Sequence, residues 1–358
     1  MNLRPRPIRP VGPFFPAGRP APRRPLARRP DAQRGAALLT AMIIVTLVVT
    51  MAASMVWQQW RAVQVETAER ARAQAGWILS GALDFARLIL KEDLRSGRPT
   101  ALTEPWATPL AEARLSTFLA ANKSSTDDGP EAFLSGSIAD AQARYNLTNL
   151  VSAGKVDALE LATLQRLCQG LSIDTSVAQR IADGLRDASA AATDADAAGR
   201  AGTAASSLEI SPATSRNAPL LPRSVAQLSW LGIDAATLKA LEPHVVLLPV
   251  ATALNVNTAA PEVLVAVIKG LDLATAQRLL QVRRSAPFKD LPSFAEQLAT
   301  LAPLPTRLDV RSSFFEVRGK LRLADRVLVE RSLVQRYPSG QIDVLQRDRS
   351  ASLEPIGP

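Results

Sequence analysis

The feature that most constrains this chain is an uncharged, strongly apolar run over residues 36–56. An α-helix of that length spans about 31 Å, which is enough to cross the hydrocarbon core of a bilayer. Trp57 and Trp60 follow the run, where aromatic side chains gather at a membrane interface. We therefore predict one transmembrane helix. The alternative is a cleaved secretory signal, which the length of the run and the lack of a small-x-small cleavage site disfavour.

The basic charge of the chain lies almost entirely before this run. The formal net charge is +9, and residues 1–35 hold nine Arg but only one Asp. The remainder is nearly neutral, which argues against a nucleic-acid-binding surface. By the positive-inside rule, the basic leader stays in the cytoplasm and the residues after the run are exported.

The helix is predicted to continue far beyond the membrane. No proline occurs between Pro30 and Pro99, and Gly97-Arg98-Pro99 is a typical helix end. A helix of about 90 Å is rare in a soluble domain, but it suits a subunit that lays its helix along a filament axis. Apolar residues at helical spacing predict the face that packs on the rest of the protein: Ala71, Ala75, Ile78, Ala82, Phe85 and Ile89.

Three segments between residues 150 and 300 repeat one pattern of helix, glycine-containing turn and helix. They cover residues 170–181, 231–241 and 270–279. Glycine tolerates the positive φ of a helix C-terminus, and an Asp or Thr that follows can cap the next helix. Residues 151–305 are therefore predicted to form a helical domain. Residues 184–215 lack apolar periodicity and predict a long flexible loop within it.

The C-terminal region changes to a period of two. Residues 315–322 alternate apolar and charged side chains, and two further strands are predicted at 327–336 and 342–345. They predict an antiparallel meander over residues 306–347, followed by a tail over 348–358.

Candidate catalytic residues are scarce. Cys168 and His244 are the only cysteine and histidine, which disfavours zinc sites and histidine-based triads. Cys168 lies among leucines and is predicted to be a buried, unreactive thiol. The chain has neither a nucleophile elbow nor a phosphate loop. We predict that the protein is not an enzyme, and a membrane-anchored periplasmic enzyme is correspondingly disfavoured.

The start of the apolar run resembles the processing site of type IV pilins and pseudopilins. Arg34-Gly35 is followed at once by the apolar helix. In that family a prepilin peptidase cuts after the glycine and methylates the new N-terminus, which would be Ala36 here, and the leader 1–35 would be removed. Most members carry Glu at the fifth mature position, whereas this chain carries Thr40.

Three later segments narrow the resemblance to one family. Residues 140–150, residues 254–264, and Arg216-Asn217-Ala218-Pro219 followed by residues 224–228 are similar to segments of the type II secretion system minor pseudopilin K (GspK) family. The order and spacing agree over about residues 30–347, and the lack of the fifth-position Glu is usual in this member.

The resemblance implies an α+β fold. A pilin-like long N-terminal helix would pack on a small antiparallel sheet, with a large all-α domain of two SAM-like subdomains inserted before the sheet. The helix would comprise the transmembrane part 36–56 and a periplasmic amphipathic part 57–97. Residues 98–150 would begin the pilin-like region.

The resemblance also implies a place in a secretion machine. Such a protein caps the tip of the periplasmic pseudopilus and promotes its assembly, for export of folded proteins across the outer membrane. Its partners would be the other minor pseudopilins (the I and J members), the major pseudopilin and the prepilin peptidase. It would cross the bacterial inner membrane once, with its N-terminus in the cytoplasm and its body in the periplasm.

Members of the family often bind calcium through an Asp-containing segment near residue 185. This chain has Asp183 and Asp187, then Asp194 and Asp196, but Gly184 stands where Trp is expected. Calcium needs six to eight oxygen ligands. A calcium site at these four residues and ordinary solvated carboxylates therefore stay open as alternatives.

The main functional alternative is a membrane-anchored DNA-uptake protein with helix-hairpin-helix modules. Residues 255–259 resemble the entry segment of such modules. However, Asp272 and Ser172 stand where a module of this kind usually has a second glycine. A carboxylate there would repel a phosphate, so we predict no nucleic-acid binding.

Overall fold

The structure is a computed structural model that describes residues 33–114, 132–201, 219–298, 304–323 and 326–353, with side chains except at 33–35, 194–201 and 353. The leader residues 1–32 and the predicted loop residues 202–215 lie outside these ranges. The chain divides into two compact units, Met1–Arg70 and Ala71–Pro358. Each unit is described by itself.

Helix α1 extends over Gln33–Arg95, as the proline-free stretch predicts. In the first unit its apolar residues are exposed, and an 18-residue stretch has a mean hydropathy of 2.4 with none of it buried. By length and composition α1 can therefore span a membrane. The helix ends as expected, because Gly97 takes a φ of 66° and its N–H donates to the Leu94 carbonyl at 3.1 Å.

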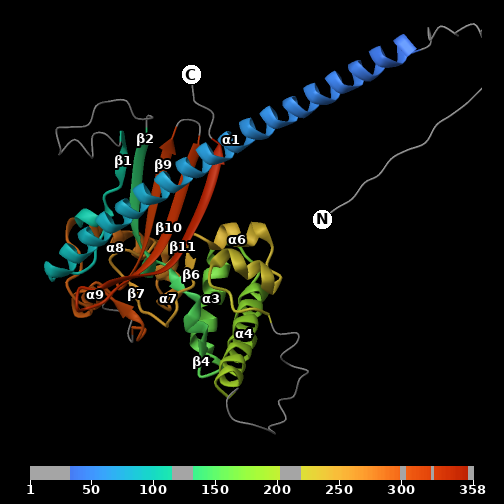
Figure 1. Cartoon of the computed structure of the whole chain (residues 1–358). Helices are drawn as coiled ribbons and strands as arrows, with labels where there is room; N and C mark the ends of the chain where they lie inside the picture. Colours follow the sequence, from blue (N-terminus) through green and yellow to red (C-terminus); the bar gives the residue numbers. More distant parts are fainter. Residues whose placement is uncertain (1–32, 115–131, 202–218, 299–303, 324–325, 354–358) are drawn as a thin grey trace, which may run out of the picture. The chain divides into compact units, whose positions relative to one another are not determined.

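The second unit contains a five-stranded antiparallel sheet in the order β1-β2-β9-β10-β11 (Figure 1). The strands are β1 (Leu110–Arg114), β2 (Ala132–Asp140), β9 (Phe314–Leu323), β10 (Arg326–Arg336) and β11 (Ile342–Leu353). The three C-terminal strands confirm the predicted meander, whereas β1 and β2 were not predicted. The predicted tail was wrong over residues 348–353, because β11 stays paired with β10 as far as Leu353.

Residues 71–95 of α1 pack along one face of this sheet. The buried line on the helix is Ala75, Leu79, Leu83, Ala86 and Leu90. The predicted apolar face is therefore rotated, and Phe85, which it included, is 56% exposed. The rotation has a local reason. Gly319 of β9 has no side chain, and a Cβ there would lie only 2.9 Å from Leu79 Cδ2, so Leu79 sits directly on the sheet.

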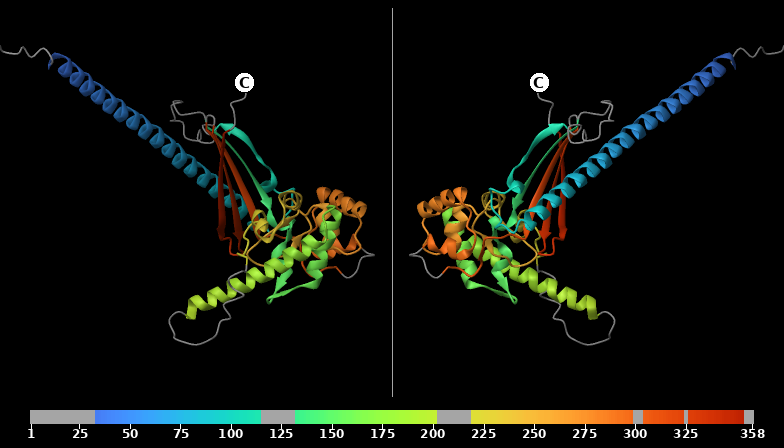
Figure 2. Two further views of the ribbon diagram at one scale, coloured as in Figure 1. Left: turned by 90° about the vertical axis from the view of Figure 1, so that its right-hand side faces the viewer. Right: turned by 90° about the vertical axis from the view of Figure 1, so that its left-hand side faces the viewer.

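A helical domain is inserted between β2 and β9, which are neighbours in the sheet. Figures 1 and 2 show it beyond one end of the strands. Its helices are α3 (Ala158–Gly170), α4 (Ser176–Ala201), α6 (Ala235–Leu241), α7 (Pro261–Val267), α8 (Leu273–Ser285) and α9 (Leu291–Glu296), with the 3₁₀ turns η2 (Ala141–Ala143), η3 (Leu147–Leu150) and η4 (Val225–Leu231). Three two-stranded pairs accompany them: β3 (Tyr145–Asn146) with β6 (Val245–Val246), β4 (Val151–Ser152) with β5 (Lys155–Val156), and β7 (Leu254–Asn255) with β8 (Leu308–Asp309).

The predicted helical hairpins are confirmed as α3–α4, η4–α6 and α7–α8. Gly232 and Gly270 have positive φ values of 76° and 87° at two of the turns, and Ser172 takes that conformation in the other. Asp234 and Asp272 cap α6 and α8, each accepting a backbone N–H at the start of the helix.

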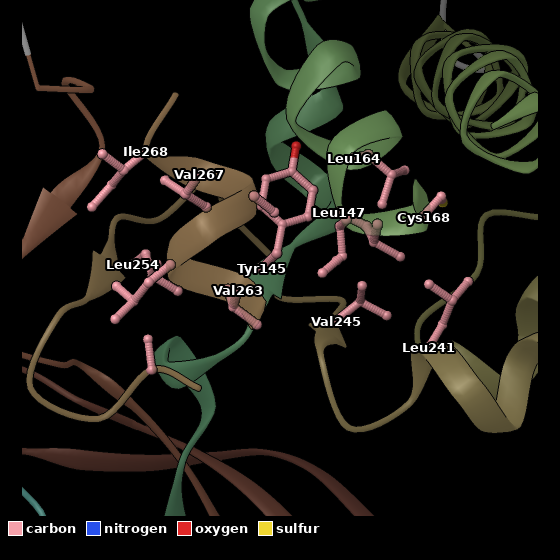
Figure 3. Packing of buried hydrophobic residues seen from close by; sticks show 14 of the residues in the cluster. Tyr145, Leu147, Leu164, Cys168, Leu241, Val245, Leu254, Val263, Val267 and Ile268 are labelled. Atoms are coloured by element: carbon pink, nitrogen blue, oxygen red, sulfur yellow. The ribbon is translucent and has the colours of Figure 1, made fainter. Parts of the chain in front are cut away.

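The hairpins enclose one hydrophobic core. Figure 3 shows Tyr145, Leu164, Val245 and Val263 converging from different elements of this domain. Cys168 lies in this core without exposure, and burial raises the pKa of its thiol to about 11. The thiol is therefore protonated at neutral pH, in agreement with the predicted unreactive role.

The predicted flexible loop was wrong over residues 184–201, because α4 runs without a break to Ala201. Ile181, Leu185 and Ala188 are buried at helical spacing and hold this helix on the core. The Ala-rich residues that follow have high helix propensity, which the lack of apolar periodicity concealed.

We expect Leu90→Ala to lower the free energy of unfolding by about 2–5 kcal/mol, because it opens a cavity between α1 and the sheet. Leu90 has no exposed surface, whereas Leu88 on the same helix is 62% exposed. Leu88→Ala is the matched control and should change stability by less than about 0.5 kcal/mol. Urea unfolding of the full-length variants in detergent measures both. Equal losses would contradict the described packing of α1.

Candidate functional site

A buried arginine marks the place where α1, the sheet and the helical domain meet. Arg336 of β10 forms an ion pair with Asp93 near the end of α1, and both side chains are almost fully buried. Its guanidinium also donates to the Leu90 carbonyl at 3.1 Å and to the Ser312 carbonyl at 3.0 Å. The group lies over the ring of Phe315, 4.7 Å from its centroid. Arg336 therefore joins α1 to two segments of the sheet region.

A second buried charge, Asp140 at the end of β2, has only neutral direct partners. Its Oδ2 accepts hydrogen bonds from Asn255 Nδ2 at 2.9 Å and from the hydroxyls of Thr258 and Ser312 at 2.6 Å each. Its Oδ1 accepts the Gln142 N–H at 2.8 Å. Burial raises the pKa of this carboxyl, and the four donors oppose the rise.

The two charges share neighbours. Arg336 donates to Thr100 Oγ1 at 3.1 Å, and Thr100 Oγ1 in turn accepts the Ser312 N–H. The Thr100 carbonyl accepts a hydrogen bond from Asn255 Nδ2 at 3.0 Å. One continuous polar cluster, which we call the junction, thus connects α1, the sheet and the helical domain. Its members are Asp93, Thr100, Asp140, Asn255, Thr258, Ser312 and Arg336.

Paired amide contacts extend from the junction into the helical domain. Asn149 and the backbone of Thr252 exchange two hydrogen bonds of 2.9 and 3.0 Å. Asn257 does the same with the backbone of Phe288, at 2.9 Å in both directions. The buried backbone groups of these loops have no partner in a helix or sheet. The two asparagine side chains provide the hydrogen bonds that these groups would otherwise lack.

Two of the three segments that carry the sequence resemblance meet at the junction, whereas Arg216-Asn217-Ala218 of the third lies outside the described residues. Residues 140–150 and 254–264 lie side by side at the junction. The sequence alone placed both segments but missed their contacts with Arg336, Asp93 and Ser312. The available signal was a set of uncharged polar residues inside otherwise apolar stretches, which is typical of buried polar groups with specific partners.

The predicted processing residues lie at the start of α1. Gly35 and Ala36 are within the helix, and the Thr40 hydroxyl donates to the Ala36 carbonyl one turn earlier. Thr40 thus satisfies its own polar group within the helix and adds no charge there. Cleavage after Gly35 stays a prediction.

The predicted calcium ligands do not form an open site where the structure describes them. Asp183 and Asp187 lie one turn apart on α4, and Arg186 between them forms ion pairs with both, at 2.8 and 3.0 Å. Asp194 and Asp196 are on the same helix, and their side chains lie outside the described ones. Across the described part of the chain, no group of three or more His, Cys, Asp or Glu could hold a metal ion.

Comparison with known proteins identifies the same segments. Models of the family "Type II secretion system (T2SS), protein K" match residues 143–250 and 254–311. A protein named "Type II secretion system protein K" from Pseudomonas aeruginosa is 28% identical over 330 residues, covering 90% of this chain and 94% of the relative. A relative of the same name from Pectobacterium carotovorum is also 28% identical, over 87% of this chain and 95% of its own length.

A solved structure has the same fold. It is titled "The Crystal Structure of the GspK-GspI-GspJ complex from enterotoxigenic Escherichia coli Type 2 Secretion System". The TM-score is 0.58 at 22% sequence identity, and the match covers 79% of this chain and 98% of that one. The α+β architecture predicted from the sequence is thereby confirmed.

We expect Asn255→Ala to destabilise the protein by about 2–4 kcal/mol, because it leaves the buried Thr100 carbonyl without its side-chain donor and removes one of the donors to Asp140. Gln169→Ala is the matched control, since it removes an amide from an exposed position on α3 and should cost less than about 0.5 kcal/mol. Chemical denaturation of both variants tests the role of the junction. An Asn255→Ala protein as stable as the parent would contradict it.

Calcium addition is expected to leave the melting temperature unchanged, because Asp183 and Asp187 are already paired with Arg186 and no third possible ligand joins them among the described residues. Isothermal titration and a melting curve with calcium or a chelator measure this directly. A calcium-dependent rise in melting temperature that Asp194→Asn or Asp196→Asn removes would instead support the four-aspartate site.

Proposed function

Because the chain belongs to the type II secretion system protein K family, we propose that this minor pseudopilin occupies the tip of a periplasmic pseudopilus and promotes its assembly. The pseudopilus would serve the export of folded proteins across the outer membrane. The main support for a position at the tip is the inserted helical domain, because its location on the pilin-like unit limits where another subunit can stack.

The position of this domain follows from the junction. Asp93 and Leu90, near the C-terminal end of α1, contact Arg336, and the helical domain begins at the same place through Asp140. Within the second unit, the bulk of the helical domain therefore lies at the end of the sheet where α1 stops. A further subunit stacked at that end would collide with it. A first subunit also has no neighbour above it whose N-terminal amine needs a carboxylate, which agrees with Thr40 at the fifth mature position.

The proposed topology rests on α1 and on the basic leader. The apolar start of the helix would anchor the protein in the inner membrane, and the Arg-rich leader would stay in the cytoplasm, with the body in the periplasm. A prepilin peptidase would then remove residues 1–35. The proposed partners are the major pseudopilin and the I and J minor pseudopilins, whose counterparts were solved in complex with the similar chain.

The proposed role is structural and not enzymatic. The DNA-uptake alternative gains no support from the hairpins, because Asp234 and Asp272 accept the backbone N–H groups of Thr237 and Thr275. The first turns of α6 and α8 thus face a carboxylate at the place where a phosphate would need free N–H donors.

We expect Gly35→Leu to leave a precursor that is longer by the leader, because a peptidase that cuts after glycine needs room at that position. Immunoblots of cells that also express the prepilin peptidase measure the two forms, and secretion of a type II substrate should fall. Gln33→Leu is the matched control and should be cut as usual. A short form and normal secretion with Gly35→Leu would contradict the processing proposal.

A further inference from the structure

Strand β11 forms one edge of the five-stranded sheet (Figure 1). Within the part of the chain that the structure describes, it pairs on one side only, with β10. It is 12 residues long and contains neither proline nor lysine, the residues that commonly protect an edge from further pairing. Residues 347–352 are exposed on both faces of the strand. This open half of β11 therefore presents backbone N–H and C=O groups that another extended chain can bind.

A β-bulge precedes the open half of β11. Leu333 and Val334 of β10 pair with Gln346 and Val344, so Leu345 is the extra residue between them. Its side chain is 39% exposed. Bulges re-aim side chains and are common beside functional sites. Leu345 and Gln346 line a cleft of about 590 Å³, so the open half of the strand and this cleft adjoin each other.

The cleft lies between the sheet and the helical domain. Its walls are mostly aliphatic, with Leu147 from η3, Leu185 from α4, Leu248 from the residues after β6, and Leu333 from β10. Arg223 is the one charged residue among the described residues that line it. The cleft therefore suits an apolar side chain, and its single charge favours a segment that also carries carboxylates.

Two arginines lie on one face of the open half. Arg347 and Arg349 are two residues apart, and both form ion pairs with the buried Glu330. One carboxylate thus faces two guanidinium groups, whose side chains are 36% and 44% exposed. Oppositely charged side chains on neighbouring strands stabilise the pairing of those strands. Asp348 between the arginines belongs to the other face, so acidic side chains suit only one face of an added strand.

We propose that β11 binds an extended acidic segment of another protein by strand addition. The segment pairs with residues 347–352, places acidic side chains opposite Arg347 and Arg349, and inserts an apolar side chain into the cleft beside Leu345. In this mode of recognition, main-chain hydrogen bonds supply affinity and the side-chain contacts supply selectivity. The occupant is a strand because an edge offers its backbone groups in extended geometry. The inference goes beyond the proposed place in the pseudopilus and does not depend on it.

The test uses a synthetic peptide, Leu-Leu-Glu-Thr-Glu-Leu-Leu, labelled with fluorescein and added to the full-length chain in detergent. The peptide reads the same in both directions, so it tests parallel and antiparallel pairing alike. Fluorescence anisotropy should show saturable binding. A control peptide with proline in place of the threonine should bind about tenfold more weakly or less, because proline removes a backbone donor and disfavours a strand. The two peptides partition alike into detergent, so their difference measures pairing.

Variants of the chain locate the binding. Leu345→Asp should lower the affinity for the threonine peptide about tenfold or more, because it puts a charge at the mouth of an apolar cleft. Leu159→Asp is the matched control, since Leu159 is 81% exposed and outside the cleft lining. Arg347→Gln should weaken binding and reduce its salt dependence, while Arg349 keeps Glu330 paired. Arg318→Gln, at an exposed position on β9, should bind as the parent does.

Hydrogen exchange gives an independent readout, because the threonine peptide should protect the backbone amides of residues 347–352. Absence of this protection, failure of the parent chain to bind the threonine peptide, or equal binding of the proline peptide would overturn the proposal. Parent-like binding by both Leu345→Asp and Arg347→Gln would do the same. Self-association that Leu345→Asp abolishes would identify a second copy as the occupant and also overturn it. Each of these outcomes leaves the proposed function intact, since processing and secretion test that separately.

Discussion

The second unit of this protein depends on one buried guanidinium. Arg336 contacts the end of α1 through Asp93 and the Leu90 carbonyl, the sheet through the ring of Phe315, and the segments that precede β1 and β9 through Thr100 and Ser312. Removal of an arginine from water is costly unless its donors are satisfied. Here the five contacts that satisfy the guanidinium also connect three separate stretches of chain. The positions of these stretches relative to one another are therefore fixed.

The junction achieves this connection mainly with neutral groups. Asp140 and the Arg336–Asp93 pair are separated by Thr100, Asn255 and Ser312, which carry the hydrogen bonds between them. Hydrophobic packing alone is non-directional and tolerates small rotations of one domain against another. Hydrogen bonds with fixed donors and acceptors do not tolerate such rotations without leaving a buried polar group unsatisfied. The junction therefore fixes the orientation of the helical domain relative to the sheet.

Much of the architecture could be predicted from local sequence patterns. The proline-free apolar stretch predicted α1, period-two alternation predicted the last three strands, and glycine-aspartate turns predicted the helical hairpins. These patterns depend on residues that are close in sequence, so a short stretch is enough to reveal them. The C-terminal part of α4 was missed because its Ala-rich stretch lacks the apolar periodicity on which the prediction relied. β1 and β2 were missed because neither shows a clear period of two, and because β2 also pairs with β9, which is distant in sequence.

The junction and the exposed side of α1 could not be predicted for a related reason. Arg336 and Asp93 are separated by most of the chain, and each alone resembles an ordinary surface charge. Phe85 was predicted to be buried because its spacing fits the apolar stripe of α1. The rotation that exposes it depends on Gly319, which belongs to a strand far along the sequence. Only the three-dimensional contacts distinguish a residue that packs on the sheet from one that is left open beside it.

The insertion of the helical domain between β2 and β9 has a consequence for folding. Asp140 and Phe315, at the ends of these neighbouring strands, pair directly although the whole helical domain separates them in sequence. In an unfolded chain, closing so long a loop carries a large entropic cost, which slows the pairing. If the helical hairpins fold first, through contacts between nearby residues, they bring the two strand ends together and shorten the effective loop. The inserted helical domain would then also act as the nucleus on which the sheet is completed.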